Sequence, residues 1–112
     1  MYPNETHFPF LLQEILEKTT IERIRISSLG PEYLNDAFFA VIENPRIMPH
    51  SHLSIQSFSD HVLQGMRRNY TAKELEEVLI RFSQLKRLDS ISLGADIIVG
   101  FPGETEQDFQ ET

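Results

Sequence analysis

Cysteine is missing from all 112 residues of this chain. Without thiols the chain forms no disulfide, no thiolate zinc site and no cysteine nucleophile, and this segment alone cannot hold an iron–sulfur cluster. Long apolar runs are missing too, since no stretch approaches the roughly 20 consecutive apolar residues that cross a bilayer. The first ten residues lack the basic segment and the small-residue cleavage site of a secretory signal. These absences predict a cytoplasmic protein with no membrane partner.

Positive charge is scarce. Ten Lys and Arg face seventeen Asp and Glu, which gives a net charge of -7, so the chain as a whole lacks the basic footprint of a free-standing nucleic-acid binder. Four acids fall in the last nine residues, so the acidity is mostly a property of the tail. With 40% apolar and 24% charged residues and no repeat or linker, the chain is expected to form one globular unit.

Helical periodicity occurs in several parts of the chain. Apolar residues recur every three or four positions, and Asn44-Pro45 ends one of these patterns. Ser59, Thr71 and Thr105 stand where side chains cap helices, and Glu74 completes a capping box with Thr71. Helices are therefore predicted over 8–18, 33–42, 60–66 and 72–87, with a further helix starting after residue 105.

Three segments show strand patterns. Residues 22–28 and 51–57 alternate apolar and polar side chains, whereas 95–101 is almost continuously apolar, as in a strand buried on both faces of a parallel sheet. Because helices separate these strands, parallel pairing and an α/β fold are predicted. Three parallel strands leave two open edges, which natural proteins normally cover. We therefore expect a fragment of a larger domain, which forms homodimers through its open sheet edges.

Small and polar residues stand at the carboxyl end of each predicted strand. They are Ser27 and Ser28 in the first, Gln56 and Ser57 in the second, and Gly100-Phe101-Pro102-Gly103-Glu104 in the third. Ligands of parallel α/β folds bind beyond the carboxyl ends of the strands. Gly100 would let a ligand approach the backbone, and Phe101 offers an apolar surface for a flat ring. The alternative is that these residues form only structural turns and polar strand ends.

Two other groups of residues have a weaker functional interpretation. His50 and His52 lie two apart and hence on one strand face, but no third metal ligand stands at a helpful spacing. Arg67, Arg68 and Tyr70 form a small basic and aromatic cluster that could contact an RNA phosphate. The alternatives are polar strand residues for the first group and solvated loop residues for the second.

Taken in order, several motifs resemble those of the radical SAM methylthiotransferases. These are Arg23-Ile-Arg-Ile-Ser-Ser-Leu29, His52-Leu-Ser-Ile-Gln-Ser-Phe-Ser-Asp60, Val62-Leu63, Met66-Arg67-Arg68 with Tyr70-Thr71, and Asp96-Ile-Ile-Val-Gly-Phe-Pro-Gly-Glu-Thr105. The resemblance covers about residues 22 to 112. The Arg-x-Arg-x-Ser-Ser segment resembles the branch that methylthiolates N6-threonylcarbamoyladenosine at position 37 of tRNA more than the isopentenyladenosine branch.

The resemblance implies an α/β fold, namely a partial (β/α) radical SAM TIM-type barrel with about three parallel strands and flanking helices. Residues 1–112 would be a fragment of the (β/α)6 barrel that lacks the cluster-binding loop and the terminal domains. The resemblance also implies an enzyme of the transferase class, which uses S-adenosylmethionine and two [4Fe–4S] clusters to insert a methylthio group into tRNA. This chain's own side chains would hold neither cluster, so the isolated chain is expected to be inactive.

The resemblance also assigns a cofactor-binding set. Gln56 and Ser57 match the strand end that approaches the ribose and methionine parts of S-adenosylmethionine, and the segment 98–101 matches the one that packs near the adenosine. The predicted set is Ser28, Gln56, Ser57, Ile98, Gly100 and Phe101, with no catalytic or metal-ligating residue. The alternatives are a ribosomal-protein or other radical SAM methylthiotransferase and a non-catalytic half-barrel binding module.

Overall fold

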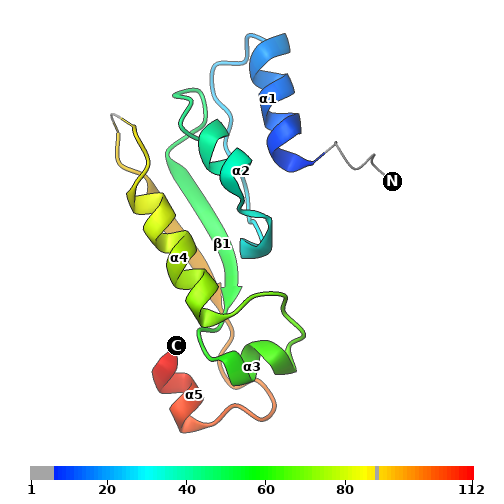
Figure 1. The fold of residues 1–112 in the computed structure, drawn as a ribbon, viewed down its shortest axis with the longest axis vertical. Helices are drawn as coiled ribbons and strands as arrows, with labels where there is room; N and C mark the ends of the chain where they lie inside the picture. The colour runs from blue at the N-terminus through cyan, green and yellow to red at the C-terminus, as the bar shows by residue number, and fades with distance from the viewer. Residues whose placement is uncertain (1–6, 88) are drawn as a thin grey trace.

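The computed structural model describes residues 7–87 and 89–112, and it has the predicted α/β class with parallel strand pairing. Figure 1 shows an elongated molecule in which the strands run along the long axis. Its elements are α1 (Phe8–Lys18), the 3₁₀ turn η1 (Pro31–Tyr33), α2 (Asp36–Val41), β1 (His50–Gln56), α3 (Asp60–Gly65), α4 (Ala72–Ser83), β2 (Ser92–Ile97) and α5 (Glu106–Glu111). No helix among these residues is long and apolar enough to cross a membrane.

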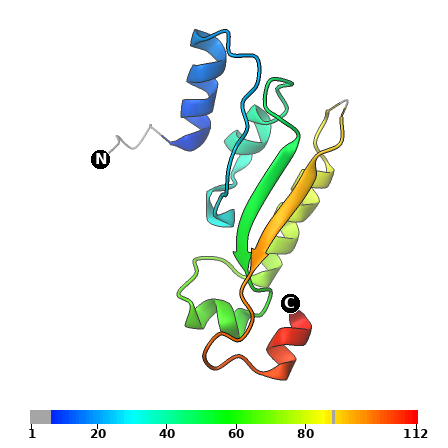
Figure 2. The same ribbon diagram turned by 180° about the vertical axis from the view of Figure 1, so that it is seen from behind.

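Strands β1 and β2 pair in parallel, from His50 opposite Ser92 to Gln56 opposite Ile97. The register shifts between Leu53 and Gln56, where β1 has one extra residue. Side chains of β1 alternate as predicted, with Leu53 and Ile55 buried. Seen from behind, the two strands have their helices on one side only (Figure 2). The opposite face of the strand pair is therefore open.

The segment predicted as the first strand, 22–28, does not form a continuous strand. This segment and the following Leu29 contact β1 and the loop before it through two isolated parallel bridges, Ile24 with Ile47 and Leu29 with Leu53. Between the two bridges the chain advances by five residues on one side, from 24 to 29, and by six on the other, from 47 to 53. The two backbones are therefore out of register between the bridges. The alternation is still correct, because Ile26 is buried while Arg23 and Arg25 are exposed.

The prediction that 95–101 is buried on both faces is wrong. β2 ends at Ile97, and most of its residues are exposed, including Leu93 at 41% and Ile97 at 40%. β2 pairs with β1 along one edge, and among the described residues no strand pairs with its other edge. Its apolar composition therefore marks a surface suited to burial that the described residues leave open.

Helix starts follow the capping residues closely. α1 has the predicted bounds, with Pro9 in its first turn. Ser59, Thr71 and Thr105 each accept a hydrogen bond from a backbone N–H of the helix that they cap. The helix predicted over 33–42 is divided, because Asn35 Oδ1 accepts from the Phe38 N–H at 2.9 Å and starts α2 after the turn η1.

The core lies between the helices and β1, and its centre is aromatic. Phe38 is fully buried, and its ring lies 5.5 Å from Phe39, 6.4 Å from Phe82 and 6.5 Å from Phe8, between centroids. Aliphatic residues of α1, α3, α4, β1 and the segments before β1 belong to the same buried cluster, among them Leu12, Ile26, Ile42, Ile47, Leu53, Leu63 and Leu75. This core fixes β1 against α2 and α4 and so positions the carboxyl end of β1.

A buried arginine holds the loop between α2 and β1. The Arg87 side chain is 3% exposed and donates to the carbonyls of Ile42, Asn44 and Ile47, the last at 2.9 Å. Its guanidinium also pairs with Asp89 at 2.7 Å. One side chain that follows α4 therefore binds three carbonyls of this loop, of which, among the described residues, only that of Asn44 has a second donor, the Ile47 N–H.

Candidate functional site at the carboxyl ends of the strands

Both strands end on the same side of the molecule, next to α3 and α5 (Figures 1 and 2). The loop after β1 carries Gln56 and Ser57, and the loop after β2 carries Ile98, Gly100 and Phe101. The backbone joins the two loops, because the Ile98 N–H donates to the Gln56 carbonyl at 2.9 Å. Five of the six predicted cofactor-binding residues therefore lie at one rim.

Ser28 does not reach this rim. The adjacent Leu29 pairs with Leu53, which places Ser28 level with the middle of β1. At ~3.3 Å per residue, Ser28 lies roughly 13 Å before Gln56 along the strand direction. The parallel register therefore corrects the sequence-based expectation that all three strand ends meet at one level.

Gln56 adopts a strained backbone conformation. Its φ of 72° lies in the left-handed region, which non-glycine residues avoid at a cost of ~1–2 kcal/mol. It is half-buried at the last position of β1, on the face opposite to Leu53 and Ile55. The strain and the register shift together turn the chain out of the sheet and toward α3.

Ser57 is fully buried, and its hydroxyl is already engaged. Ser57 Oγ accepts from the Ser59 N–H at 3.0 Å and lies 3.0 Å from Thr112 Oγ1. Thr112 Oγ1 also accepts from the Phe58 N–H at 3.1 Å. These contacts give Ser57 a structural function in joining the end of α5 to the loop after β1.

Two left-handed glycines shape the loop after β2. Gly100 and Gly103 have φ values of 80° and 89°, which side chains of L residues rarely adopt. Glu104 Oε1 accepts from the Gly100 N–H at 2.5 Å, and the Glu104 N–H donates to the Phe101 carbonyl at 2.8 Å. A Cβ at Gly100 would have no described neighbour within 4 Å. Open space thus adjoins the Gly100 backbone.

Ile98 and Phe101 differ in how much surface they offer. Ile98 is 43% exposed, beside the still more exposed Val99. Phe101 is half-buried against α3, where a Cβ added to Gly65 would lie 3.2 Å from Phe101 Cε2. The apolar surface at the rim therefore comes mainly from Ile98 and Val99. A hollow of about 320 Å³ adjoins it, lined by Val99, Gly100, Glu104, Thr105, Glu106 and Phe109.

A buried carboxylate connects the two loops. Asp108 is 5% exposed and accepts from Ser59 Oγ at 2.7 Å and from the Thr105 N–H at 2.9 Å. His61 Nδ1 lies 2.8 Å from Asp108 Oδ2, the same oxygen that accepts from the Thr105 N–H. Thr105 Oγ1 in turn accepts from the Asp108 N–H, which completes the capping box of α5. Sequence analysis predicted Thr105 and Ser59 as caps but missed their joint partner, because the pairing is tertiary.

These hydrogen bonds control the ionisation of Asp108. The Thr105 backbone N–H, followed by His61 and Ser59, holds the pKa of Asp108 well below its usual value of 3.8. His61 of α3 is the titratable group in hydrogen-bonding contact with this carboxylate, and the contacts from the α5 side are neutral. A lowered pKa in the folded state means that ionised Asp108 stabilises the fold at neutral pH and loses this effect in acid.

An acid titration tests this assignment. We expect Asp108→Asn to lower the urea midpoint at pH 7, and we expect the difference from the wild-type chain to shrink progressively below about pH 4. The other carboxyl groups titrate in both proteins, so the comparison isolates Asp108. A difference in midpoint that is the same at pH 7 and pH 3 would show that the ionisation of Asp108 does not stabilise the fold.

The open face of the strand pair is polar. His52 Nε2 lies 3.0 Å from Asp96 Oδ1, and His50 Nδ1 lies 2.7 Å from Ser92 Oγ. A Cβ at Gly94 would lie only 2.7 Å from His52 Nδ1, so a side chain at this position would displace the His52 ring. Asp96 is a partner of His52 that the sequence spacing did not reveal. Among residues 7–87 and 89–112 no group of three metal-ligating side chains gathers.

The basic and aromatic cluster of Arg67, Arg68 and Tyr70 does not form one exposed surface, because its members differ in burial. The Tyr70 hydroxyl donates to the carbonyls of Ser54 and Ile55 at 3.0 and 2.7 Å, and Tyr70 is buried. Burial raises the pKa of this hydroxyl above its usual value. Arg67 remains exposed. Tyr70 is therefore not available to contact an RNA phosphate as part of this cluster, because its ring packs in the core and its hydroxyl binds β1.

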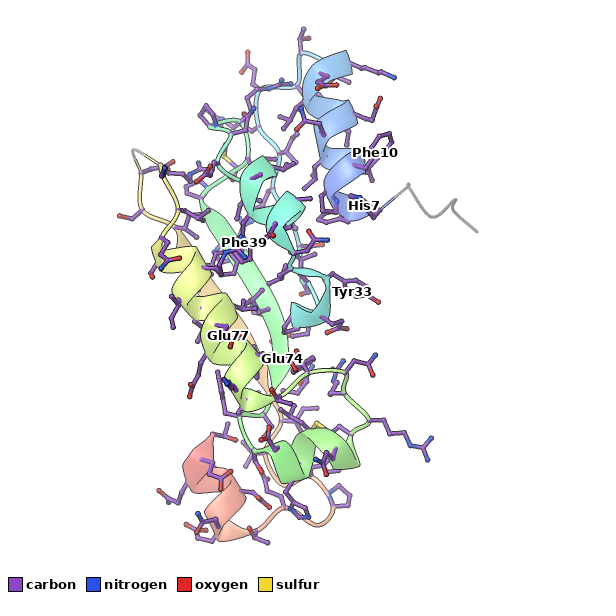
Figure 3. The ribbon with its side chains drawn as sticks, in the orientation of Figure 1. His7, Phe10, Tyr33, Phe39, Glu74 and Glu77 are labelled. Atoms are coloured by element: carbon purple, nitrogen blue, oxygen red, sulfur yellow. The ribbon has the colours of Figure 1, made fainter. Side chains whose placement is uncertain are left out.

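A larger hollow, of about 490 Å³, lies away from the rim between η1, α2 and α4. Phe39, Glu74 and Glu77 line it, and Figure 3 shows them on the helices that cover the sheet. It does not include any of the six predicted cofactor-binding residues. The geometry of the strand ends, and not the size of this hollow, therefore identifies the candidate site.

A sequence model described as the radical SAM superfamily matches residues 2–112. The chain belongs to the radical SAM superfamily. The resemblance stated from the motifs is thereby confirmed, and the partial parallel α/β architecture agrees with it. The rim formed after β1 and β2 is then the carboxyl-terminal side of a partial radical SAM barrel, the side on which ligands of parallel barrels bind.

Curated proteins similar to this chain include tRNA methylthiotransferases. The chain is 47% identical over 105 residues to the threonylcarbamoyladenosine tRNA methylthiotransferase MtaB of Treponema pallidum (strain Nichols), with 94% of this chain and 21% of that protein covered. It is 42% identical over 103 residues to the tRNA-2-methylthio-N(6)-dimethylallyladenosine synthase of Wolbachia pipientis wMel, covering 91% and 23%. The chain thus spans about a fifth to a quarter of these relatives.

The residues of this radical SAM chain fit one of the family's two cofactors. With no cysteine in the sequence, the chain has no thiolate to hold an iron–sulfur cluster. S-adenosylmethionine fits better, because the open space at Gly100 admits a ligand to the backbone and the exposed Ile98 offers an apolar surface for adenine. Gln56 supplies a side-chain amide at the same rim.

Proposed function

We propose that this chain forms part of the S-adenosylmethionine-binding barrel of a tRNA methylthiotransferase. The observation that supports the proposal is the rim where the loops after two parallel strands meet, with a strained Gln56 on one and the open Gly100 on the other. Bound there, S-adenosylmethionine would supply radical chemistry for inserting a methylthio group at an adenine. A cytoplasmic location accompanies the proposal, because the substrate is tRNA.

The proposed ligand-binding residues differ in how accessible they are to the ligand. Gln56 would hydrogen-bond polar parts of the ligand, Gly100 would admit it to the backbone, and Ile98 would pack on its adenine. Ser57 and Phe101 would act less directly, because Ser57 already binds Ser59 and Thr112 while Phe101 packs on α3. Ser28 would contribute only to a ligand long enough to reach the middle of β1.

The clusters would come from outside this chain. We propose that residues 1–112 are a barrel fragment, and that a longer protein provides the cysteine loop and the terminal domains for two [4Fe–4S] clusters and tRNA. Relatives four to five times as long as the matched segment support this division. The isolated chain is expected to have no methylthiotransferase activity.

The proposed nucleoside is N6-threonylcarbamoyladenosine at position 37, with methylthiolation at C2. The Arg-x-Arg-x-Ser-Ser motif at residues 23–28 and the similarity to the Treponema protein support it. Similarity to dimethylallyladenosine synthases supports the second candidate. Incubating the full-length gene product with tRNAs carrying either nucleoside, followed by mass spectrometry of the digests, distinguishes the two. A ribosomal-protein substrate or a purely binding half-barrel predicts no methylthiolated nucleoside.

Binding of S-adenosylmethionine tests the assigned residues. In the full-length, reconstituted gene product, Gln56→Ala should weaken binding about five-fold, the equivalent of one hydrogen bond of ~1 kcal/mol. Gly100→Val should weaken it at least as much, because a branched residue at positive φ is strained by ~1–2 kcal/mol and fills the open space. Equilibrium dialysis measures both dissociation constants.

Gln84→Ala is the matched control for these variants, because Gln84 is exposed at the opposite end of α4 from the rim. Its dissociation constant should equal that of the wild-type protein. Unchanged binding in Gln56→Ala and Gly100→Val, with both proteins folded, would leave these residues with a structural function only.

Self-association of the isolated chain is a further expectation. The second edge of β2 has no partner among the described residues, and Leu93 and Ile97 beside it are largely exposed. Pairing of two copies along this edge would satisfy its backbone groups. The net charge of -7 opposes association, but screening beyond ~8 Å at physiological salt weakens this repulsion. Sedimentation over a wide concentration range should show a dimer, and a single monomeric species throughout would contradict the expectation.

A further inference from the structure

We propose that Asp108 is a positioning residue that clamps the two loops of the rim together in the geometry that binds S-adenosylmethionine. The inference rests on the proposed function, because that function makes the relative position of these loops matter. It concerns a residue that touches neither Gln56 nor Gly100, and that lies in a helix beyond the ligand-binding segments.

The clamp begins with the placement of the carboxylate between two helix starts. Ser59 caps α3 directly after the loop of Gln56 and Ser57, and Thr105 caps α5 directly after the loop of Gly100. The Asp108 oxygens bind one group from each start, Ser59 Oγ at 2.7 Å and the Thr105 N–H at 2.9 Å. One carboxylate thus fixes the distance between residues that are almost fifty positions apart.

A second connection runs parallel to the first. Thr112, at the end of α5, lies 3.0 Å from Ser57 Oγ and accepts from the Phe58 N–H at 3.1 Å. Both ends of α5 are therefore attached to the loop after β1. These hydrogen bonds hold α5 against the loop after β1.

Burial makes the clamp hard to replace by water. Asp108 is 5% exposed, and Ser57 and Ser59 are fully buried. Hydrogen bonds to charged groups are worth about twice as much as neutral ones. Asparagine has the same shape as aspartate but only one acceptor oxygen, so it cannot accept from both Ser59 Oγ and the Thr105 N–H in the same geometry.

Amide hydrogen exchange on the 112-residue chain gives the first test. The informative amides are those of Phe58 and Ser59, because they bind Thr112 and Ser57 and not Asp108 itself. If Asp108 joins the loops, Asp108→Asn should speed exchange at both amides about ten-fold, and so should Ser59→Ala. The double variant Ser59→Ala/Asp108→Asn should be close to either single variant, because the partners act as a pair.

The control is Thr71→Ala. Thr71 caps α4 in the same way that Ser59 caps α3, with a hydrogen bond to the Glu74 N–H at 3.2 Å, but it has no contact with Asp108. It should lose a similar amount of stability without faster exchange at Phe58 and Ser59. Unchanged exchange at these amides in Asp108→Asn would overturn the proposal and reduce Asp108 to a local cap of α5.

Ligand binding gives the second test, in the full-length, reconstituted gene product. Asp108→Asn should weaken S-adenosylmethionine binding about five-fold, whereas Thr71→Ala should leave the dissociation constant unchanged. Faster exchange with unaltered affinity would overturn the positioning role. Failure of the wild-type protein to bind S-adenosylmethionine would instead refute the proposed function, and with it any positioning role for Asp108 at that site. The exchange data would still decide whether Asp108 joins the loops.

Discussion

Replacing Arg87 with methionine is expected to lower the free energy of unfolding by about 3–5 kcal/mol, enough to unfold many small domains. The methylene part of the side chain would be kept, but the carbonyls of Ile42 and Ile47 would lose their donor, and the Asn44 carbonyl would keep only the Ile47 N–H. Each buried acceptor left without a partner costs about 1–3 kcal/mol. Urea denaturation followed by circular dichroism measures the change.

Arg81→Met is the matched control. Arg81 also forms an ion pair, with Asp36 at 2.7 Å, and its guanidinium lies 4.5 Å from the centre of the Phe39 ring. Its side chain is 41% exposed and Asp36 is almost fully exposed, so we expect a loss of about 1 kcal/mol. Equal losses of unfolding free energy in the two variants would contradict the assignment of Arg87 as the buried side chain that holds the loop between α2 and β1.

Replacing Phe38 with alanine is expected to lower the free energy of unfolding by about 3–5 kcal/mol as well. Phe38 is fully buried among Phe8, Phe39 and Phe82, so the variant would leave a cavity that three aromatic rings border. A void of this kind loses both the transfer free energy and the contacts of the ring. The same denaturation experiment applies.

The control for this variant is Phe10→Ala. Phe10 lies on the outer side of α1 and is 44% exposed, so removing its ring should cost less than about 1 kcal/mol. A small loss in Phe38→Ala would mean that the helices rearrange to close the cavity. The aromatic centre would then not be the feature that fixes β1 against α2 and α4.

Sequence analysis predicted those features of the fold that local chemistry decides. The apolar spacing and Pro9 set α1, and the hydroxyls of Ser59, Thr71 and Thr105 set the starts of three other helices. Asn35 shows how a local signal was overlooked, since its side chain starts α2 within a stretch that periodicity alone extends to a longer helix.

Features that depend on neighbours were harder to predict. The apolar residues of β2 indicate a buried strand, but whether a strand is covered depends on elements elsewhere, and here Leu93 and Ile97 stay exposed. Residues 22–28 have the right alternation, but their pairing depends on the register with β1. The same register separates Ser28 from the rim.

In the candidate site, too, local sequence predicted some features, whereas others depend on tertiary contacts. The motifs located Gln56, Ile98 and Gly100 at one rim, because the carboxyl ends of parallel strands must lie together. They could not locate Asp108, because the sequence between Ser59 and Asp108 contains no sign that a carboxylate returns to the cap of α3. Nor could they show that Tyr70 turns inward to bind two carbonyls of β1.

The parallel register of β1 and β2 has a consequence for how quickly the chain folds. His50 pairs with Ser92, 42 positions later, so the strands cannot zip together from a tight turn as a hairpin does. The chain must close that long loop before the pairing stabilises it, and contacts of high sequence separation slow folding. α3 and α4, which are local, can form first. The rim, which needs both strand ends, is therefore among the last parts of the molecule to be assembled.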